Sequence, residues 1–186
     1  VEIAKKYGVE LLVCSSLNRN SGTIVREKTK MEKMLISGVA ADKNVARIRV
    51  AGLDNDPNST FKLLNLLDKN NLNIDVMIQS IGKDNTKSVS FTVAKTDLLR
   101  TLDVLNAHQD SLGFKKLTSD DKVAKVSVIG AGVRSHSGVA AKMFGALANA
   151  GINTEMVTTS EIRITALINE DYTDLAMRAI HETFLE

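Results

Sequence analysis

Residues 51–75, AGLDNDPNSTFKLLNLLDKNNLNID, and residues 131–155, AGVRSHSGVAAKMFGALANAGINTE, follow the same plan at an offset of 80 positions. Each stretch begins with Ala-Gly at the end of a strand-like run, passes through a polar turn and enters a helix-like pattern. The positions that match are Ala51 with Ala131, Leu67 with Leu147, and Asn73-Ile74-Asp75 with Asn153-Thr154-Glu155. Chance rarely keeps one offset across three elements, so the sequence predicts a single module present twice.

The first copy is predicted to follow the order βαββαβ. Alternating or apolar runs bounded by turn residues indicate its strands, and large apolar residues at helical spacing indicate its helices. The predicted strands are 45–52, 72–81, 88–94 and 113–119, and the predicted helices are 58–70, which follows an Asn/Ser cap region, and 95–109. The apolar positions at helical spacing are Phe61, Leu63, Leu64 and Leu67 in the first helix and Leu98, Leu102 and Leu105 in the second.

The second copy has the same order but stops one strand short. Its predicted strands are 123–132, 152–160 and 161–168, and its predicted helices are 137–151 and 170–185. The inward positions are predicted to be Val139, Met143, Phe144 and Leu147 on the first helix and Tyr172, Leu175, Ala176, Ala179 and Ile180 on the second. Because an open sheet edge is usually paired or covered, we expect the strand-like run 34–42, MLISGVAAD, to complete this sheet.

This arrangement predicts an α+β protein of two ferredoxin-like (βαββαβ) domains, with the first inserted into the second. The first domain is expected at residues 45–120, and the second at residues 31–44 plus 121–186. The preceding residues 1–30 are expected to hold a helix at 1–7 with Gly8 as its stop, strand-like runs at 9–16 and 23–28, and the start of a charged connection at 26–33.

The composition narrows the class of protein. The 186 residues are 44% hydrophobic, which is enough to build real cores. Lys plus Arg (24) nearly balance Asp plus Glu (22), and aromatic residues make up only 4%, which argues against nucleic acid as a partner. No membrane-spanning run or signal sequence is found, so a cytoplasmic location is expected. Residues expected to be buried are Cys14, Met77, Met143, Met156 and Met177.

The turn that precedes each first helix has the chemistry of a small-molecule site. Backbone N–H groups at a helix N-terminus are unpaired and favour a carboxylate. Asn73 and Asn153 each carry an amide that both donates and accepts, which suits a zwitterion, although such residues are also ordinary turn and cap residues. The first turn is acidic and the second is basic or neutral, so a cationic effector would prefer the first. The charged residues are Asp54 and Asp56 in the first turn and Arg134 and His136 in the second.

Two segments resemble the paired ACT domains of bacterial aspartokinase, the kinase of the aspartate-family amino acid pathway. They are GLDNDPNSTFKLLNLLDKNNLNIDVMIQS and KVSVIGAGVRSHSGVAAKMFGALANAGINTEMVTTSEIRITALI. The first 25 residues, VEIAKKYGVELLVCSSLNRNSGTIV, are similar to the closing helix and strand of that enzyme's catalytic domain. The resemblance implies a regulatory region that binds lysine, threonine or both. It also implies a homodimer through ACT domains, with the catalytic domain or alpha subunit as a partner. ATP and Mg²⁺ would bind to that catalytic domain, and this chain would be inactive alone.

The resemblance also implies which residues contact the effector. In a dimer, the turn 55–60 and Gln79 of the first domain would face the second domain of the other chain, with Gln79 bonding the effector and the backbone near Asn58 taking its carboxylate. Two positions depart from the family pattern, Asn58 where Gly is frequent and Thr154 where Ile is common, so the effector stays open. The full set of candidate residues is Asn55, Asp56, Pro57, Asn58, Ser59, Thr60, Asn73, Gln79, Ala140, Asn153, Thr154 and Ser160.

Other classes of protein find weaker support in the sequence. GAGVRS lacks the third glycine of a dinucleotide fingerprint, and DNDPN lacks the later glycine and glutamate of a calcium loop. The histidines His108, His136 and His181 share no metal-ligand spacing, and no catalytic residues or metal ligands are expected. Two alternatives remain: an ACT-type amino-acid sensor of another enzyme, and an RNA-binding module of the same topology. The second would need exposed aromatics, and Phe91 is the sole aromatic on a predicted central strand.

Overall fold

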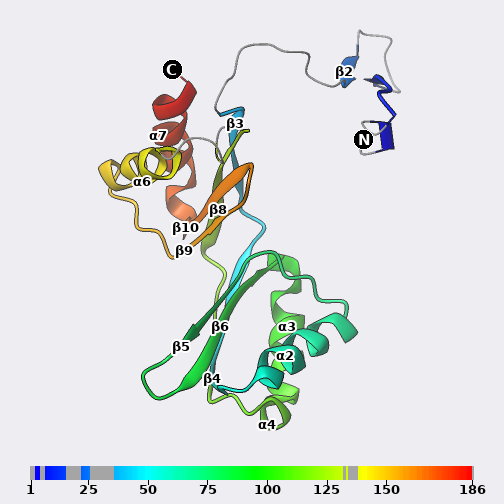
Figure 1. Ribbon diagram of the computed structural model, residues 1–186, viewed down its shortest axis with the longest axis vertical. Coiled ribbons are helices and arrows are strands. Elements are labelled where there is room, and N and C mark those ends of the chain that lie inside the picture. The colour runs from blue at the N-terminus through cyan, green and yellow to red at the C-terminus, as the bar shows by residue number, and fades with distance from the viewer. Residues whose placement is uncertain are drawn as a thin grey trace. The chain divides into compact units, whose positions relative to one another are not determined.

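The computed structural model describes residues 3–4, 7–15, 22–25, 36–131, 133 and 138–185 (Figure 1). The chain divides into two compact units, Val1–Lys33 and Met34–Glu186. In the first unit, strands β1 (Leu11–Val13) and β2 (Thr23–Val25) pair antiparallel. Both predicted strand-like runs therefore contain a strand, and residues 16 and 26–28 of those runs lie outside the described residues. The charged connection predicted at 26–33 lies outside the described residues.

The first half of the larger unit contains a four-stranded antiparallel sheet in the order β5-β6-β4-β7. Figure 1 shows helices α2 and α3 on one face of this sheet. Along the chain the elements are β4 (Ala46–Asp54), α2 (Pro57–Lys69), β5 (Met77–Ile81), β6 (Thr86–Val93), α3 (Leu98–Ala107), the short α4 (Gln109–Leu112) and β7 (Lys116–Asp120). The predicted order βαββαβ is confirmed, with α3 continued by the extra turn α4.

The second sheet has the order β3-β8-β10-β9 and is also antiparallel. Its elements are β3 (Gly38–Asp42), β8 (Val123–Ile129), α6 (Val139–Asn149), β9 (Met156–Thr159), β10 (Arg163–Asn169) and α7 (Thr173–Leu185). β3 pairs along its length with β8, from Gly38 opposite Ile129 to Asp42 opposite Lys125. The expectation that the run before the first domain completes the second sheet is thus confirmed, and so is the α+β fold class.

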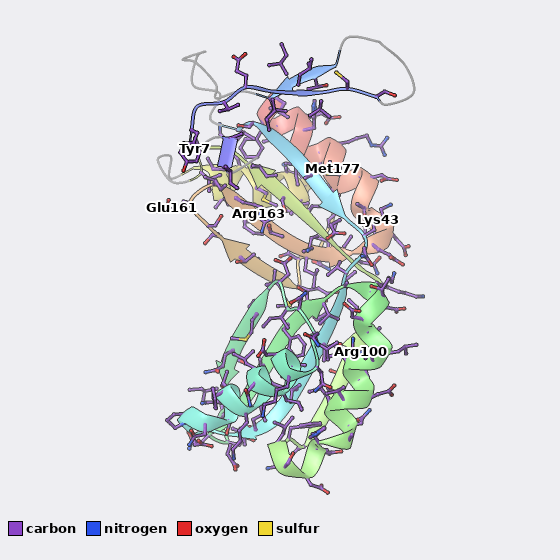
Figure 2. The ribbon with its side chains drawn as sticks, turned by 90° about the vertical axis from the view of Figure 1, so that its right-hand side faces the viewer. Tyr7, Lys43, Arg100, Glu161, Arg163 and Met177 are labelled. Atoms are coloured by element: carbon purple, nitrogen blue, oxygen red, sulfur yellow. The ribbon has the colours of Figure 1, made fainter. Side chains whose placement is uncertain are left out.

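Each sheet packs its own core against its helices. The buried residues under α2 and α3 include Ile48, Val50, Leu63, Leu67, Val89, Phe91 and Leu105, and those under α6 and α7 include Val126, Val128, Met143, Leu147, Ile164, Ala176 and Ile180. At the edges of the cores, polar bonds join neighbouring elements. Arg100 on α3, labelled in Figure 2, donates to the backbone oxygen of Asn70 at 2.6 Å. Lys43, also labelled there, follows β3 and lies 3.6 Å from Asp174 on α7.

Several predicted burials are wrong. Phe61 is 64% exposed because Leu63 and Leu67 define the inward face of α2 and Phe61 points away from it. Tyr172 is 47% exposed because it lies in a 3-10 turn before α7, where helical spacing does not apply. Leu175 on α7 and Met77 on the edge strand β5 are also exposed, and so is Cys14, which follows β1. Met143 and Met156 are buried as expected, and Met177 is partly buried.

The two sheets are in direct contact through a small apolar cluster and several ion pairs. The cluster comprises Val45, Val76, Val123, Met156 and Leu167, drawn from both domains. Around it, Arg47 on β4 forms an ion pair with Glu155, and Lys95 lies 2.9 Å from Glu170. Lys125 on β8 contacts Asp75 of the first domain. A change in one domain therefore has a physical route to the other.

Candidate functional site

The acidic turn caps helix α2 with its own side chain. Asp56 is the N-cap residue and Pro57 occupies the first helical position. One carboxylate oxygen of Asp56 accepts a 2.6 Å bond from the backbone N–H of Asn58, and the other accepts a 2.6 Å bond from the Ser59 hydroxyl. The Ser59 bond and then the Asn58 bond hold the pKa of Asp56 below its ordinary value. The cap therefore starts at Asp56, earlier than the predicted Asn/Ser region.

Two hydrogen bonds, one helical turn apart, tie the start of α2 to the sheet. The Thr60 hydroxyl donates to the side-chain oxygen of Gln79 at 2.6 Å. Four residues earlier, the ammonium of Lys87 donates to the backbone oxygen of Asp56 at 2.6 Å. Gln79 on β5 and Lys87 on β6 share the helix-covered face, because residues two apart on paired strands point the same way. The predicted site residue Gln79 and the predicted turn are thus brought together.

A third polar contact fixes the position of the turn itself. The side-chain amide of Asn55 donates to the side-chain oxygen of Asn85 at 2.8 Å. Asn85 belongs to the hairpin turn between β5 and β6, which is closed by a 2.8 Å bond from the Gly82 N–H to the Thr86 oxygen. The hairpin therefore supports the turn from the side of the sheet, and the turn is a built structure rather than a loose loop.

Asn73 lies apart from this group. It follows the C-terminal end of α2, whereas Asn55 to Thr60 lie at its N-terminal end. A helix of 13 residues is about 20 Å long, at roughly 1.5 Å per residue. Asn73 is exposed, and its backbone precedes β5 by four residues. The structure therefore gathers the predicted turn and Gln79 at one corner of the first domain and leaves Asn73 near the opposite end.

The predicted residues of the second domain occupy three separate places. Ala140 lies in the first turn of α6, and Asn153 and Thr154 lie between α6 and β9. Ser160 follows β9, and its N–H donates to the backbone oxygen of Arg163 at 2.7 Å. The turn residues Arg134 and His136 fall outside the described part of the chain. Whether these groups meet the first domain of another chain stays a prediction.

Lys87 is a candidate site residue that the sequence reasoning missed. Its side chain is buried, at 7% exposure, on the same face as Val89 and Phe91. Alternate residues of the predicted strand 88–94 face the core, and extending that alternation back to position 87 places a lysine on the apolar face. This alternation was the signal available in the sequence. With Lys87 below it and Asp56 engaged in capping, the first turn is not simply acidic. It combines a fixed carboxylate with a buried ammonium.

Two further features limit the class of function. Phe91, the aromatic that an RNA-binding module would need on its surface, is fully buried in the first core. Within the described residues, no helix has the length and apolar character needed to cross a membrane. The polar corner of the first domain brings the amide of Gln79, the ammonium of Lys87 and the capped turn together.

Comparison with known proteins agrees with this architecture. A family model described as an ACT domain matches residues 126–184. An aspartokinase of Pseudomonas aeruginosa is 38% identical over 187 residues, which cover 99% of this chain and 45% of that protein. A crystal structure of aspartokinase alpha and beta subunits is 44% identical with a TM-score of 0.76, covering 80% of this chain and 98% of that one. The ligand-free regulatory subunit of aspartate kinase from Thermus thermophilus is 33% identical, also with a TM-score of 0.76, covering 81% and 99%.

The paired sheets and the polar turn therefore define a regulatory module of two ACT domains. The similarity over nearly the whole chain goes further than the fold. The chain belongs to the aspartokinase family, as a regulatory region of such an enzyme. It spans about half the length of the curated relatives that it matches.

Proposed function

We propose that this chain binds lysine, threonine or both and thereby inhibits an aspartokinase by feedback. The catalytic domain or alpha subunit of that enzyme would carry out the ATP-dependent phosphorylation of L-aspartate and bind ATP and Mg²⁺, in the cytoplasm. The observation that carries the proposal is the convergence of Gln79, Thr60 and the capped turn at one corner of the first domain, in a chain similar to aspartokinase regulatory subunits. These groups offer amide, hydroxyl and charged partners to a zwitterion.

Inhibition requires a difference in affinity. An effector shifts an equilibrium only as far as it binds the inhibited arrangement better than the active one, and couplings of about 1–3 kcal/mol are typical. The contacts between the two sheets supply a route for such coupling. Lys125 lies 2.5 Å from Asp75 in the first domain and 3.1 Å from Asp42 in the second. An effector that moves the first domain would change these contacts.

The proposal includes a homodimer formed through the ACT domains. β5 and β9 lie at the outer edges of their sheets, and an edge strand presents unpaired backbone groups that favour pairing with another chain. All five residues of β5 are exposed, including the apolar Ile78 and Ile81. A second copy pairing at these edges would cover apolar surface and place the first-domain turn near the second domain of its partner.

Calorimetric titration with lysine and threonine separately, combined with sedimentation, tests the proposal. We expect saturable binding of at least one of the two and a dimer whose population rises when that amino acid is added. Glycine serves as a control zwitterion without the effector side chain. Absence of binding for both lysine and threonine at millimolar concentration, from a folded sample, would overturn the proposed function.

A further inference from the structure

Lys87 is a buried cation with unused hydrogen-bonding capacity. Among the residues that the structure describes, its ammonium makes one hydrogen bond, to the backbone oxygen of Asp56, and no ion pair. An ammonium group has three donors, so two remain. Buried charges in proteins are usually paired because desolvation without a counter-charge is costly. The Asp56 carboxylate is close enough for Lys87 to help lower its pKa, but its two oxygens already accept bonds from Asn58 and Ser59. Lys87 therefore keeps donors that a ligand carboxylate could use.

The backbone at the start of α2 is poorly placed to bind that carboxylate instead. Pro57 has no N–H, and the Asn58 N–H already donates to the Asp56 carboxylate. The Ser59 N–H points to the Asp56 backbone oxygen at 3.4 Å. A ligand carboxylate approaching these groups would have to displace Asp56 and would meet its negative charge. Binding of the effector carboxylate by the backbone near Asn58 would therefore require the Asp56 cap to open.

We propose that Lys87 is a ligand-binding residue of the first domain and that its ammonium takes the carboxylate of the bound amino acid. This inference rests on the proposed function, because it concerns the same corner of the domain. Gln79 and Lys87 lie on one face of adjacent strands, Ile81 being paired with Lys87 and Gln79 with Val89. The two side chains are diagonal neighbours, so one small ligand can reach both.

A purely structural role for Lys87 gives different expectations. If the lysine only held Asp56 against the sheet, replacing it would alter stability. Any change in ligand affinity would then be the same for charged and uncharged ligands. If it binds the carboxylate, its contribution disappears when the ligand has none. The amides of the candidate effectors, lysinamide and threoninamide, lack that negative charge and keep the rest of the molecule. They separate the two roles.

The test compares calorimetric affinities for each amino acid and its amide in wild type, Lys87→Met and Lys62→Met. Lys62 is exposed on α2 and near enough to Asp56 to influence its carboxylate, so it controls for the loss of one positive charge in this region. Lys87→Met should weaken binding of the amino acid roughly tenfold to a hundredfold and change binding of the amide by less than about threefold. Lys62→Met should change both by about twofold or less.

Each outcome is decisive for one of the two proposals. If wild type binds neither lysine nor threonine, the proposed function fails. If wild type binds an amino acid but Lys87→Met weakens the acid and the amide equally, or neither, the role of Lys87 is overturned while the function stands. Should Lys87→Met not fold, the NMR signal of the Lys87 ammonium in wild type provides the answer. It should shift when the amino acid is added and not when the amide is, and an equal or absent shift would overturn the inference.

Discussion

The ammonium of Lys125 on β8 lies 2.5 Å from a carboxylate oxygen of Asp75, which belongs to the first domain. The same ammonium lies 3.1 Å from Asp42 on β3. Lys125 is only 16% exposed, whereas the two carboxylates are about half exposed, at 47% and 49%. The Lys125 side chain thus links two segments. One is Asp75, which lies just before β5, the strand that carries Gln79, and the other is β3, the strand that completes the second sheet.

Replacing Lys125 with Met should weaken the contact between the domains. Because both carboxylates are half exposed, we expect a loss of about 1–2 kcal/mol rather than the larger value of a fully buried pair. Urea unfolding, followed by circular dichroism, measures this. Lys142→Met, at an exposed position on α6, is the matched control and should be neutral. If the proposed function holds, Lys125→Met should also reduce the response of the second domain to effector. Equal stability of the two variants would argue against the bridge.

The same bridge predicts a pH dependence at both ends of the scale. Burial alone would lower the pKa of Lys125, but hydrogen bonds to Asp75 and Asp42 outweigh it and the pKa is raised above 10.5. A raised pKa means that the stabilisation is complete below pH 10.5 and is lost as pH rises through the folded value. The pKa of Asp42 is lowered below 3.8, against burial, by its bonds to Lys125 and Asn44, so its contribution is lost as pH falls through that lower value. The difference in unfolding free energy between wild type and Lys125→Met should shrink at both extremes, and a constant difference would contradict this.

Replacing Gln79 with Ala should weaken effector binding roughly tenfold without unfolding the domain, since the side chain is exposed and a lost hydrogen bond costs about 1 kcal/mol or somewhat more. Thr60→Val keeps the shape of residue 60 but removes the hydroxyl that orients the Gln79 amide. It should have a smaller effect in the same direction. Calorimetry on both variants, with thermal unfolding as the check on folding, measures the difference. Unchanged affinity in Gln79→Ala would remove that residue from the site.

The Asp56 cap should depend both on a side-chain acceptor and on the negative charge of that acceptor. Asp56→Ala removes the acceptor for the Asn58 N–H and should lower the unfolding temperature, whereas Asp56→Asn keeps a neutral acceptor and should lower it by a smaller amount. Since the pKa of Asp56 is lowered, its stabilisation is present at neutral pH and is lost as pH falls through the folded value. The amide shift of Asn58, followed by NMR between neutral and acidic pH, should report that loss. A pH-independent shift would mean that Asp56 does not cap the helix in solution.

The sequence predicted the topology well because repeats and edge pairing are long-range constraints that leave a readable pattern. The run 34–42 could be assigned to the second sheet from the missing strand alone, and β3 pairs there. Details of single helix faces were less predictable. Phe61 and Tyr172 are exposed although hydrophobicity favoured burial, because the inward face is set by packing against the sheet. Lys87 was missed because, from the sequence alone, a charged residue next to an apolar run indicates the end of a strand. The helix that covers Lys87 becomes apparent only in the structure.

Gly52 connects the core of the first domain to its turn. The pairing of β4 with β6 shifts between Ala51 and Leu53, which forms a bulge at Gly52. Gly52 has a φ of +81°, and a Cβ there would lie 2.7 Å from the Cβ of Lys115. The bulge turns Leu53 into the core and sends the chain toward the turn that begins at Asn55.

Gly52→Ala should therefore impose two costs, a left-handed backbone at a residue with a Cβ and a collision with Lys115, the residue before β7. Gly113 has a φ of +72°, and a Cβ added there would have nothing within 4 Å, so Gly113→Ala isolates the first cost. We expect Gly113→Ala to lose about 1 kcal/mol and Gly52→Ala to lose about 1–3 kcal/mol more, in the range of overpacking. Only Gly52→Ala should also weaken effector binding, because only that change disturbs the path into the turn. Equal losses in the two variants, measured by urea unfolding, would show that the bulge accommodates a side chain and does not hold the turn in place.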